Sequence, residues 1–184
     1  RRLLSDVSAK YYHVKPKNII AVTGTNGKTS VADLFYQILT LNNIPVASIG
    51  TLGVKRKGKI LKTGLTSPDT ISTHKFLQNL KKKKIDNVII EASSHGLDQE
   101  RLHHINFKTG IFTNFSQDHL DYHRSMKLYL NAKLILFKKI LKKNSSIITD
   151  KNINEFITLK KIAKGRNLKL IEINKLVKKI KDIY

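Results

Sequence analysis

The octapeptide Thr-Gly-Thr-Asn-Gly-Lys-Thr-Ser at residues 23–30 separates an apolar run from a helical pattern. The apolar run, residues 19–22, is typical of a buried strand, and apolar residues recur at helical spacing over residues 31–39. A glycine-rich turn between a strand and a helix cradles phosphate, because its backbone N–H groups and the positive end of the helix face the anion. The octapeptide therefore predicts nucleotide chemistry, with a chance surface turn as the alternative.

Two side chains of the octapeptide have expected roles in such a cradle. Lys28 would reach the β- and γ-phosphates, and the Thr29 hydroxyl would ligate Mg²⁺. The general pattern has its first glycine at position 22, which is Val22 here, and Gly24 is the first glycine instead. The chain thus carries a variant of the common phosphate loop.

The composition excludes several classes of protein. Cysteine is absent, which leaves no disulfide framework and no thiolate metal site and makes the cytoplasm the expected compartment. No apolar stretch approaches the roughly 20 residues of a membrane helix, so we expect no membrane insertion. The net charge of +22 comes mainly from lysine without interleaved aromatic residues. That pattern favours solvated helix faces over a specific nucleic-acid surface.

Short β-branched runs alternate with helical stretches, which predicts an α/β fold with a mostly parallel sheet and helices on both faces. The expected strands are residues 18–23, 46–49, 87–92, 109–113, 146–149 and 169–173. The expected helices are residues 29–42, 70–84, 126–142, 154–164 and 175–183. Residues 50–64 predict a hairpin or flap beside the sheet.

Polar clusters follow three of the expected strands, at residues 24–29, 91–95 and 113–123. Ligands of parallel sheets bind at the carboxyl ends of the strands, so we expect one shared site. Glu91 ends an apolar strand, where a carboxylate is costly unless it is paired or binds a metal. Beside a phosphate cradle it predicts a second Mg²⁺ anchor, with a capping or solvent-facing glutamate as the alternative.

The residues after Glu91 form a polar loop of hydroxyl, amide and guanidinium groups up to Arg101, which suits an anionic substrate. Further on, His119, Asp121 and His123 alternate, so an extended segment would place all three on one face. In isolation they fit a zinc or a magnesium site, with surface turn residues as the alternative. Lys133 lies at the edge of an apolar helix face, where spacing alone predicts a snorkelling lysine.

Several strings in this chain occur in the order found in Mur ligases. They are Val-Thr-Gly-Thr-Asn-Gly-Lys-Thr at 22–29, Thr-Ser-Pro-Asp at 66–69, Glu-Ala-Ser-Ser-His-Gly-Leu at 91–97 with Gln99 and Arg101, Phe-Thr-Asn at 112–114, Asp-His-Leu-Asp-Tyr-His at 118–123, and Tyr129 through Ala132-Lys133 to Leu136-Phe137. On these strings the chain resembles the Mur ligase family, more narrowly its UDP-N-acetylmuramoyl-dipeptide (MurE-type) branch. The loop at 23–30 alone would also fit folylpolyglutamate or cyanophycin synthetases.

The resemblance implies roles for individual residues. It implies an ATP cradle of Gly24, Thr25, Asn26, Gly27, Lys28, Thr29 and Ser30. It implies Mg²⁺ ligands Thr29, Glu91 and His119, and catalytic roles for Lys28, His119 and Lys133. It implies contacts to the UDP-MurNAc-dipeptide from Thr66, Ser67, Ser93, Gln99 and Arg101. Lys133 matches the family lysine that becomes carbamoylated, which replaces a cation that would repel Mg²⁺ by an anion.

The implied reaction is ATP-dependent amide formation in peptidoglycan synthesis. A substrate carboxylate attacks the γ-phosphate, and the amine of meso-diaminopimelate or lysine then attacks the acyl phosphate. The alternatives are another amide ligase of the superfamily, such as folylpolyglutamate synthetase, and a non-catalytic nucleotide-binding fragment.

The resemblance also implies a domain organisation. Residues 1–17 would be an interdomain linker, and residues 18–184 would be the central domain, which contains the phosphate loop and is truncated at its C-terminal end. We expect such a fragment to bind Mg²⁺–ATP weakly and to have no ligase activity alone. The chain departs from the family at Arg124, where relatives usually carry a small residue such as glycine.

Overall fold

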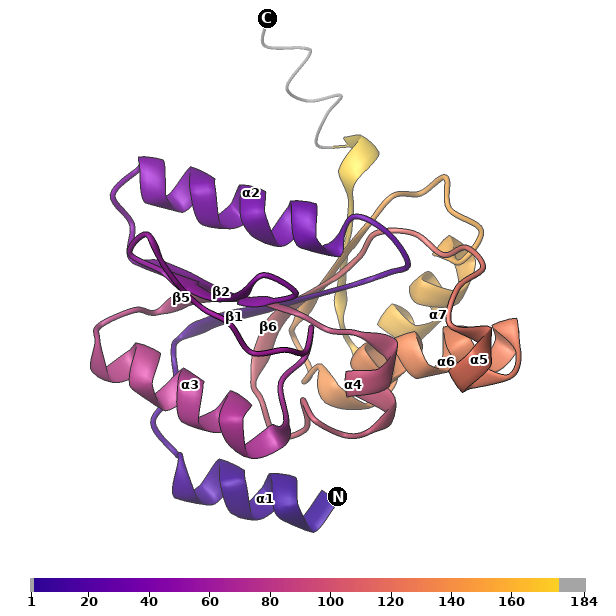
Figure 1. Cartoon of the computed structure of the whole chain (residues 1–184). Helices are drawn as coiled ribbons and strands as arrows, with labels where there is room; N and C mark the ends of the chain where they lie inside the picture. Colours follow the sequence, from indigo (N-terminus) through magenta and orange to yellow (C-terminus); the bar gives the residue numbers. More distant parts are fainter. Residues whose placement is uncertain (1, 176–184) are drawn as a thin grey trace, which may run out of the picture.

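The computed structural model describes residues 2–175, and an eight-stranded sheet runs through it in the order β4-β3-β2-β5-β1-β6-β7-β8 (Figure 1). The strands from β2 to β8 in this order are parallel, and the β3–β4 hairpin adds two antiparallel strands at one edge. The strands are β1 (Asn18–Thr23), β2 (Val46–Gly50), β3 (Gly53–Arg56), β4 (Lys59–Leu61), β5 (Asn87–Glu91), β6 (Phe107–Phe112), β7 (Ser146–Thr149) and β8 (Lys169–Glu172).

Helices cover both faces of this sheet, as the alternating pattern predicted. They are α1 (Arg2–Tyr11), α2 (Lys28–Leu41), α3 (Thr70–Lys82), α4 (Ser94–Asp98), α5 (Leu120–His123), α6 (Met126–Ile135), the π-helix η1 (Leu136–Ile140) and α7 (Phe156–Arg166). Figure 1 shows α2 on one face, with α3 and α4 on the other. Because β1 is apolar on both faces, it occupies the centre of the sheet, where Ala21 and Val22 are fully buried.

The core is divided unequally between the two faces. Under α2, a small cluster joins Val22, Ala32 and Ile89. The opposite face carries the main core, which extends from Val54 in the hairpin to Leu168 before β8. The helix carrying the phosphate loop is thus attached by few apolar contacts, while the rest of the domain packs on the other side.

The six strands predicted from sequence all occur, with ends shifted by at most two residues, and the hairpin within residues 50–64 is confirmed. The helix expected at 126–142 is different. It is α-helical only to Ile135 and then widens into the π-helix Leu136–Ile140. The last expected helix, residues 175–183, lies outside the described residues except for its first residue.

Residues 2–11, expected as part of a linker, form the helix α1. This helix packs against α3, and the Ser5 hydroxyl donates a hydrogen bond to the His103 carbonyl at 3.1 Å. Its two serines, Ser5 and Ser8, are buried, while Leu3 and Val7 face outward. Within residues 2–175 no helix is long and apolar enough to span a bilayer.

Candidate functional site

Three loops at the carboxyl edge of the sheet, following β1, β5 and β6, surround a cavity of about 260 Å³. The loops meet there because β1 lies between β5 and β6, so their carboxyl ends are neighbours. The cavity is lined by Thr25, Asn26, Gly27, Lys28, Thr29, Ser30, Thr51, Thr66, Ser93, Ser94, His119 and Lys133. The structure therefore brings together most of the residues that the sequence singled out.

The phosphate loop is held in shape by the loop after β6. The Asn26 amide donates to Asn114 Oδ1 at 2.9 Å, and the Thr113 hydroxyl donates to the Asn26 carbonyl at 2.7 Å. Gly24 has φ of 147°, and a Cβ there would lie 1.9 Å from Thr113 Oγ1. Only glycine fits this close approach, which is the physical reason for the displaced first glycine of the motif.

The helix that follows the loop opens onto the cavity without a side-chain cap. Its N-cap, Gly27, has φ of 81°, and no side chain accepts a hydrogen bond from the first turn. Lys28, Thr29 and Ser30, the first residues of α2, all line the cavity. An uncapped amino end of a fourteen-residue helix offers N–H groups and a positive dipole to an anion, as a phosphate cradle requires.

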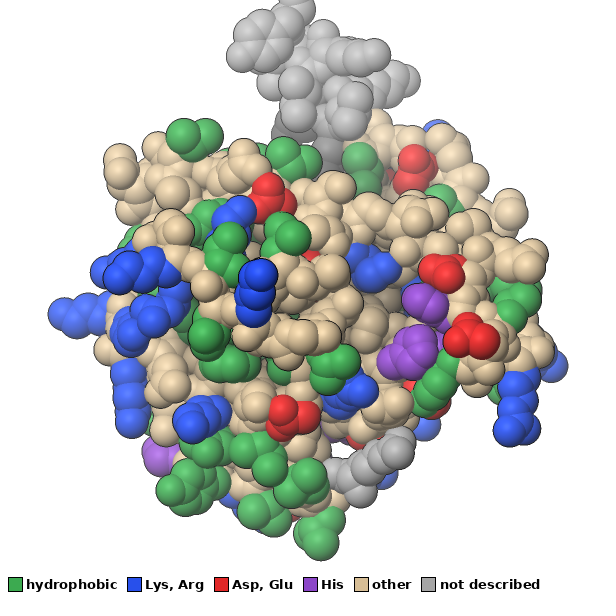
Figure 2. Space-filling view, in the orientation of Figure 1, with side chains coloured by type: hydrophobic (Ala, Val, Ile, Leu, Met, Phe, Trp, Pro, Cys, Tyr) green, Lys and Arg blue, Asp and Glu red, His purple; other side chains and the backbone are tan. Residues whose placement is uncertain are grey.

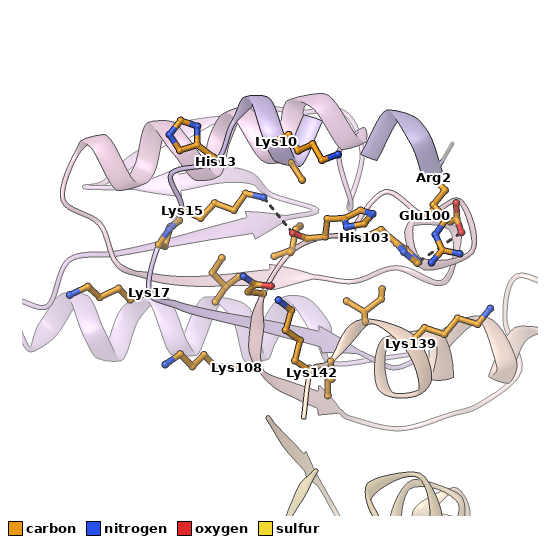
Figure 3. Close-up of a pocket in the computed structure, with 18 of the residues that line it drawn as sticks. Arg2, Lys10, His13, Lys15, Lys17, Glu100, His103, Lys108, Lys139 and Lys142 are labelled. Atoms are coloured by element: carbon orange, nitrogen blue, oxygen red, sulfur yellow. Dashed lines mark hydrogen bonds and ion pairs between the residues drawn. The ribbon is translucent and has the colours of Figure 1, made fainter. Parts of the chain in front are cut away.

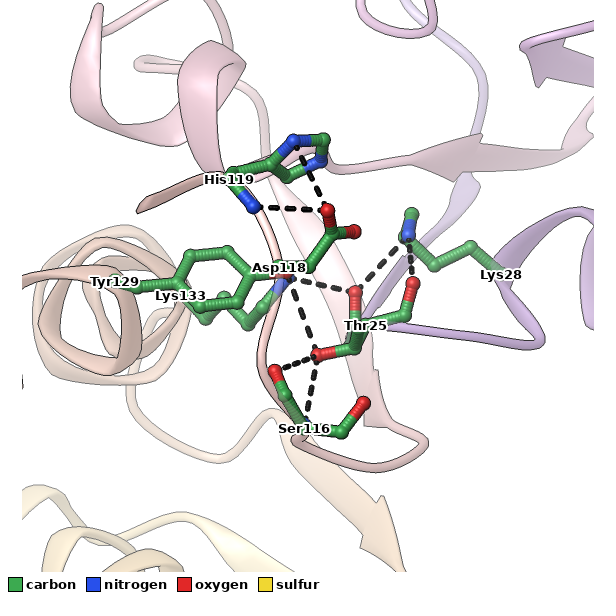
Figure 4. Close-up of polar contacts among 8 residues, drawn as sticks. Thr25, Lys28, Ser116, Asp118, His119, Tyr129 and Lys133 are labelled. Atoms are coloured by element: carbon green, nitrogen blue, oxygen red, sulfur yellow. Dashed lines mark hydrogen bonds and ion pairs between the residues drawn. The ribbon is translucent and has the colours of Figure 1, made fainter. Parts of the chain in front are cut away.

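Two lysine ammonium groups, from distant parts of the chain, share one carbonyl oxygen in this site. Lys28 Nζ lies 3.0 Å and Lys133 Nζ 2.7 Å from the Gly24 oxygen, and Lys28 also donates to the Thr25 carbonyl at 2.7 Å (Figure 4). Desolvation by burial lowers the pKa of Lys28, an effect that the nearby Glu91 and Asp118 oppose. The shared carbonyl places two like charges side by side, an arrangement that an arriving anion would relieve.

Lys133 is buried rather than snorkelling, so the expectation from helix spacing is wrong. Its side chain is 1% exposed, and its ammonium lies 4.3 Å from the centre of the Tyr129 ring. Burial lowers the pKa of Lys133 to about 7, with a further contribution from Lys28. A large fraction of Lys133 is consequently a neutral amine near neutral pH, and a neutral amine is the nucleophilic form.

Glu91 is buried at the end of β5 and forms hydrogen bonds with two threonines. Thr29 Oγ1 donates to Glu91 Oε2 at 2.8 Å, and Thr51 donates to the carboxylate through both its amide and its hydroxyl at 3.1 Å. Its exposure of 2% excludes the solvent-facing alternative, and the helix that follows, α4, is capped by Ser93 instead. Gly50 makes room for the carboxylate, because a Cβ there would lie 2.0 Å from Glu91 Oε1.

Residues 118–123 do not form the extended segment that the alternating histidines predicted. Leu120–His123 is the short helix α5, and His119 precedes it with φ of 52°. His123 is consequently buried, while His119 lines the cavity, so the three side chains do not share one face. Within residues 2–175 no three His, Cys, Asp or Glu side chains are grouped closely enough to bind a metal ion. The isolated zinc-site hypothesis is therefore wrong.

The histidines of this region belong to a cluster of aromatic rings. The His95 ring lies edge-on to His119 at a centroid distance of 5.0 Å and is tilted against Tyr122 at 4.1 Å, and His119 lies edge-on to Tyr129 at 5.8 Å. Figure 2 shows the histidines gathered beside acidic side chains on this part of the surface. The cluster fixes the His119 ring on the cavity wall, across from the phosphate loop.

Arg124 ends α5 in a left-handed conformation with φ of 62°. Glycine adopts this conformation without strain, which gives a physical reason for the small residue usual at this position. Arg124 is therefore accommodated at this position, but with a strained backbone.

All five residues of the expected substrate contacts are engaged in internal hydrogen bonds, with the Thr66 hydroxyl 3.1 Å from Thr51 Oγ1. The Ser67 hydroxyl donates to the Glu91 carbonyl at 2.9 Å and lies 3.0 Å from Ser93 Oγ, which also caps α4. Arg101 donates to the Ser67 carbonyl at 2.7 Å and, through Nε, to Gln99 Oε1 at 3.1 Å. Thr66 and Ser93 line the cavity, whereas Ser67, Gln99 and Arg101 are not part of its lining.

Three residues of the site were assigned no role from sequence, although Asp118 and Tyr129 lie in the strings shared with the Mur ligases. Thr51 donates a hydrogen bond to Glu91, and Asp118 opposes the lowering of the pKa of Lys28 and Lys133. The Tyr129 ring packs against the Lys133 ammonium (Figure 4). Thr51 could have been found, since it directly follows the carboxyl end of the second strand. Tyr129 could not, because an aromatic residue in a helix normally belongs to the core.

Comparison with known proteins agrees with this geometry. The family model described as Mur ligase middle domain matches residues 22–183. A Rickettsia montanensis protein named UDP-N-acetylmuramoyl-L-alanyl-D-glutamate--2,6-diaminopimelate ligase is 44% identical over 169 residues, which cover 90% of this chain and 35% of that protein. A protein of the same name from Zymomonas mobilis is 40% identical over 181 residues, which cover 98% of this chain and 37% of that protein. The chain therefore spans about a third of the length of these relatives.

Solved structures give the same result. A structure of UDP-N-acetylmuramoyl-L-alanyl-D-glutamate--2,6-diaminopimelate ligase superimposes with a TM-score of 0.78 at 29% identity, covering 91% of this chain and 34% of that one. E. coli FolC in complex with DHPP and ADP superimposes with a TM-score of 0.69 at 18% identity, covering 90% and 45%. The second likeness shows a shared fold.

Proposed function

Because this chain belongs to the Mur ligase family through its middle domain, we propose that it forms the nucleotide-binding and phosphoryl-transfer centre of a diaminopimelate-adding ligase. The substrates would be ATP, a UDP-MurNAc-dipeptide and diaminopimelate, and the compartment the cytoplasm. The observation that carries the proposal is the contact of 2.8 Å between Thr29 and Glu91 at the start of the helix that follows the phosphate loop.

This contact fits Mg²⁺. Octahedral Mg²⁺ binds oxygen ligands at about 2.0–2.1 Å, so two ligands in adjacent positions lie about 2.9 Å apart. Thr29 Oγ1 and Glu91 Oε2 already have nearly this separation, and one is a carboxylate, the ligand type Mg²⁺ prefers. His119, which also lines the cavity, would be a further ligand. When bound, the ion would neutralise charge on the transferring phosphoryl group.

Lys28 and the amino end of α2 would bind the phosphates of ATP. The Lys28 ammonium now donates to two carbonyls of its own loop, which keeps it at the cavity until a phosphate replaces them. The uncapped N–H groups of the first turn add donors that need no rearrangement. These groups would orient the γ-phosphate toward the attacking carboxylate of the dipeptide.

Lys133 would act after modification by carbon dioxide. Its neutral amine nitrogen attacks the carbon of CO₂, an N–C bond forms, and a proton leaves to solvent, which gives a carbamate anion. The lowered pKa favours this reaction at neutral pH, and the Tyr129 ring and the Gly24 carbonyl hold the amine in place. The carbamate would remove the repulsion between Lys133 and Lys28.

Titration of ATP into the 184-residue chain, with Mg²⁺ or with EDTA, tests the proposal. We expect Mg²⁺ to strengthen binding and Glu91→Gln to remove most of that gain, about tenfold in affinity, while leaving binding in EDTA unchanged. Glu155→Gln, at the start of α7, removes the same charge outside the cavity lining and serves as the control. Equal affinity with and without Mg²⁺, or an unaffected Glu91→Gln variant, would contradict it.

A further inference from the structure

A second cavity, about 990 Å³ in volume, lies at the opposite, amino edge of the sheet. We call it the amino-edge cavity. Its wall is formed by α1, the starts of β1 and β6, the end of η1 and the last residue of α7 (Figure 3). It shares no lining residue with the phosphate loop. Its size is at the upper end of the range for small-molecule sites.

The amino-edge cavity is strongly and unevenly charged. Eight of its lining residues are lysine or arginine, and Glu100 is its one acidic residue. Two of the cations are engaged, since Lys10 pairs with Asp6 at 3.0 Å and Arg166 donates to the Phe137 carbonyl at 2.8 Å. Five lysines of the lining form no ion pair within the described residues 2–175, namely Lys15, Lys17, Lys108, Lys139 and Lys142.

The carboxylates of neighbouring segments compensate little of this charge. Asp86, whose carboxylate accepts a hydrogen bond from the Lys17 amide, is paired with the Lys81 ammonium at 2.7 Å. Glu100 lies 4.0 Å from His103. By contrast, the ammonium of Lys55 on the β3–β4 hairpin pairs directly with Asp33. The lysines of the cavity are therefore a local excess of positive charge and not part of an ion-pair network.

Lys15 makes this excess costly. It is half-buried, and its ammonium donates only a long hydrogen bond, 3.4 Å, to the His104 carbonyl. Figure 3 shows Lys15 and Lys142 extending toward the same space from opposite walls. Burial and the neighbouring Lys142 lower the pKa of Lys15 to about 8. A multiply charged anion between the two side chains would supply the missing counter-charge to both.

We propose that the amino-edge cavity binds a compact polyanion that carries several phosphate groups. Its cations come from five separate segments and surround one concave volume. Such convergence fits a small ligand enclosed by protein. A nucleic-acid duplex instead requires a stripe of basic side chains along an open surface. An inorganic polyphosphate and a nucleoside polyphosphate share this chemistry.

Titration of inorganic tripolyphosphate, at an ionic strength of about 150 mM, tests the proposal. The chain would carry Lys28→Ala, so that the phosphate loop does not contribute. We expect Lys15→Gln/Lys142→Gln to weaken binding at least tenfold, and Lys160→Gln/Lys161→Gln, which removes the same charge from the exposed face of α7, to leave it nearly unchanged. Amide NMR shifts should change at residues 15–17 and 103–108, and circular dichroism should show that each variant is folded.

Two results would overturn the proposal. Equal loss in both double variants would show nonspecific attraction to a basic protein. Shifts confined to residues 24–30 would show that the phosphate loop is the site that binds. A parallel titration with ATP distinguishes the two sources, because tighter binding than tripolyphosphate identifies a nucleoside-bearing ligand, and equal binding identifies a bare polyphosphate.

Discussion

The two edges of the sheet both present lysines to a cavity, yet they use them in opposite ways. At the carboxyl edge, Lys28 and Lys133 are fixed by backbone carbonyls, with Glu91 and Asp118 nearby. At the amino edge, Lys15 and Lys142 extend into a wide space without a carboxylate partner. The number of charges is therefore a poor guide to a site. A lysine held by hydrogen bonds at a fixed place suits a reaction, whereas a lysine without a partner suits electrostatic attraction of an anion.

The largest expected effect comes from removing the cation at the centre of the carboxyl edge. Lys28→Ala should weaken ATP binding to the 184-residue chain by about a hundredfold, because it removes a charged donor to the phosphates, worth about 2–3 kcal/mol. Lys160→Ala, on the exposed face of α7 and outside the lining of both cavities, should leave that affinity within twofold. Competition with a fluorescent ATP analogue measures both. Similar losses in the two variants would show that overall charge, and not the position of Lys28 at the carboxyl edge, determines ATP affinity.

The next effect concerns the pH dependence of stability. Because the pKa of Lys133 is about 7 in the folded chain and ordinarily 10.5, the unfolded chain binds this proton more readily. The cost of burying the ammonium is thus fully present below pH 7 and is relieved as the pH rises toward 10.5. Relative to Lys133→Met, the unfolding free energy of the natural chain should rise by about 2 kcal/mol between pH 7 and 9 in CO₂-free buffer.

Denaturant unfolding of both chains at each pH measures this difference, and an equal pH response would refute the burial argument. In ¹³C-labelled bicarbonate, the natural chain should give a carbamate resonance that Lys133→Met lacks. Absence of the carbamate resonance from both chains would show that Lys133 is an unmodified amine.

A smaller effect should follow from crowding Glu91 through its neighbour. Gly50→Ala would place a Cβ 2.0 Å from the Glu91 carboxylate. We expect this crowding to lower the unfolding free energy by about 1–2 kcal/mol. We also expect ATP binding to lose its dependence on Mg²⁺. Gly165→Ala, within α7 and with no atom inside 4 Å of the new Cβ, should instead stabilise the chain by about 0.5–1 kcal/mol. Thermal unfolding and titration compare the two. Unchanged Mg²⁺ dependence in Gly50→Ala would argue against Glu91 as a metal ligand.

The smallest effect is expected at the amino edge. Lys142→Ser should raise the pKa of Lys15 above about 8 without restoring it to 10.5, since burial is the larger cause of the shift and Lys142 the smaller. An NMR titration of the Lys15 side chain detects this change. A Lys15 pKa that does not move would show that the two ammonium groups do not face each other.

Much of the fold was predictable because its signals are local. The strand–loop–helix pattern predicted β1, the loop at residues 24–29 and α2, and the apolar strand ending in Glu91 predicted a carboxylate beside that loop. The burial of Lys133 was not predictable, because it depends on Gly24, which lies 109 residues away. The prediction that His119, Asp121 and His123 share one face of an extended segment was wrong for a related reason. The left-handed backbone at His119 redirects the chain into a helix.

The central position of β1 also affects the order in which the site can form. Asn18 pairs with Asn87 and Ile19 with Phe107, so the two strands that flank β1 are synthesised about 70 and 90 residues after it. At translation rates of roughly 5–20 residues per second, β1 waits on the order of ten seconds for both partners. Until then the backbone N–H and C=O groups along its edges are unpaired, and the Gly24 carbonyl has neither the loop after β6 nor Lys133 beside it. Assembly of this cavity is thus a late, non-local event, and the unpaired β1 strand is an aggregation hazard until its partners arrive.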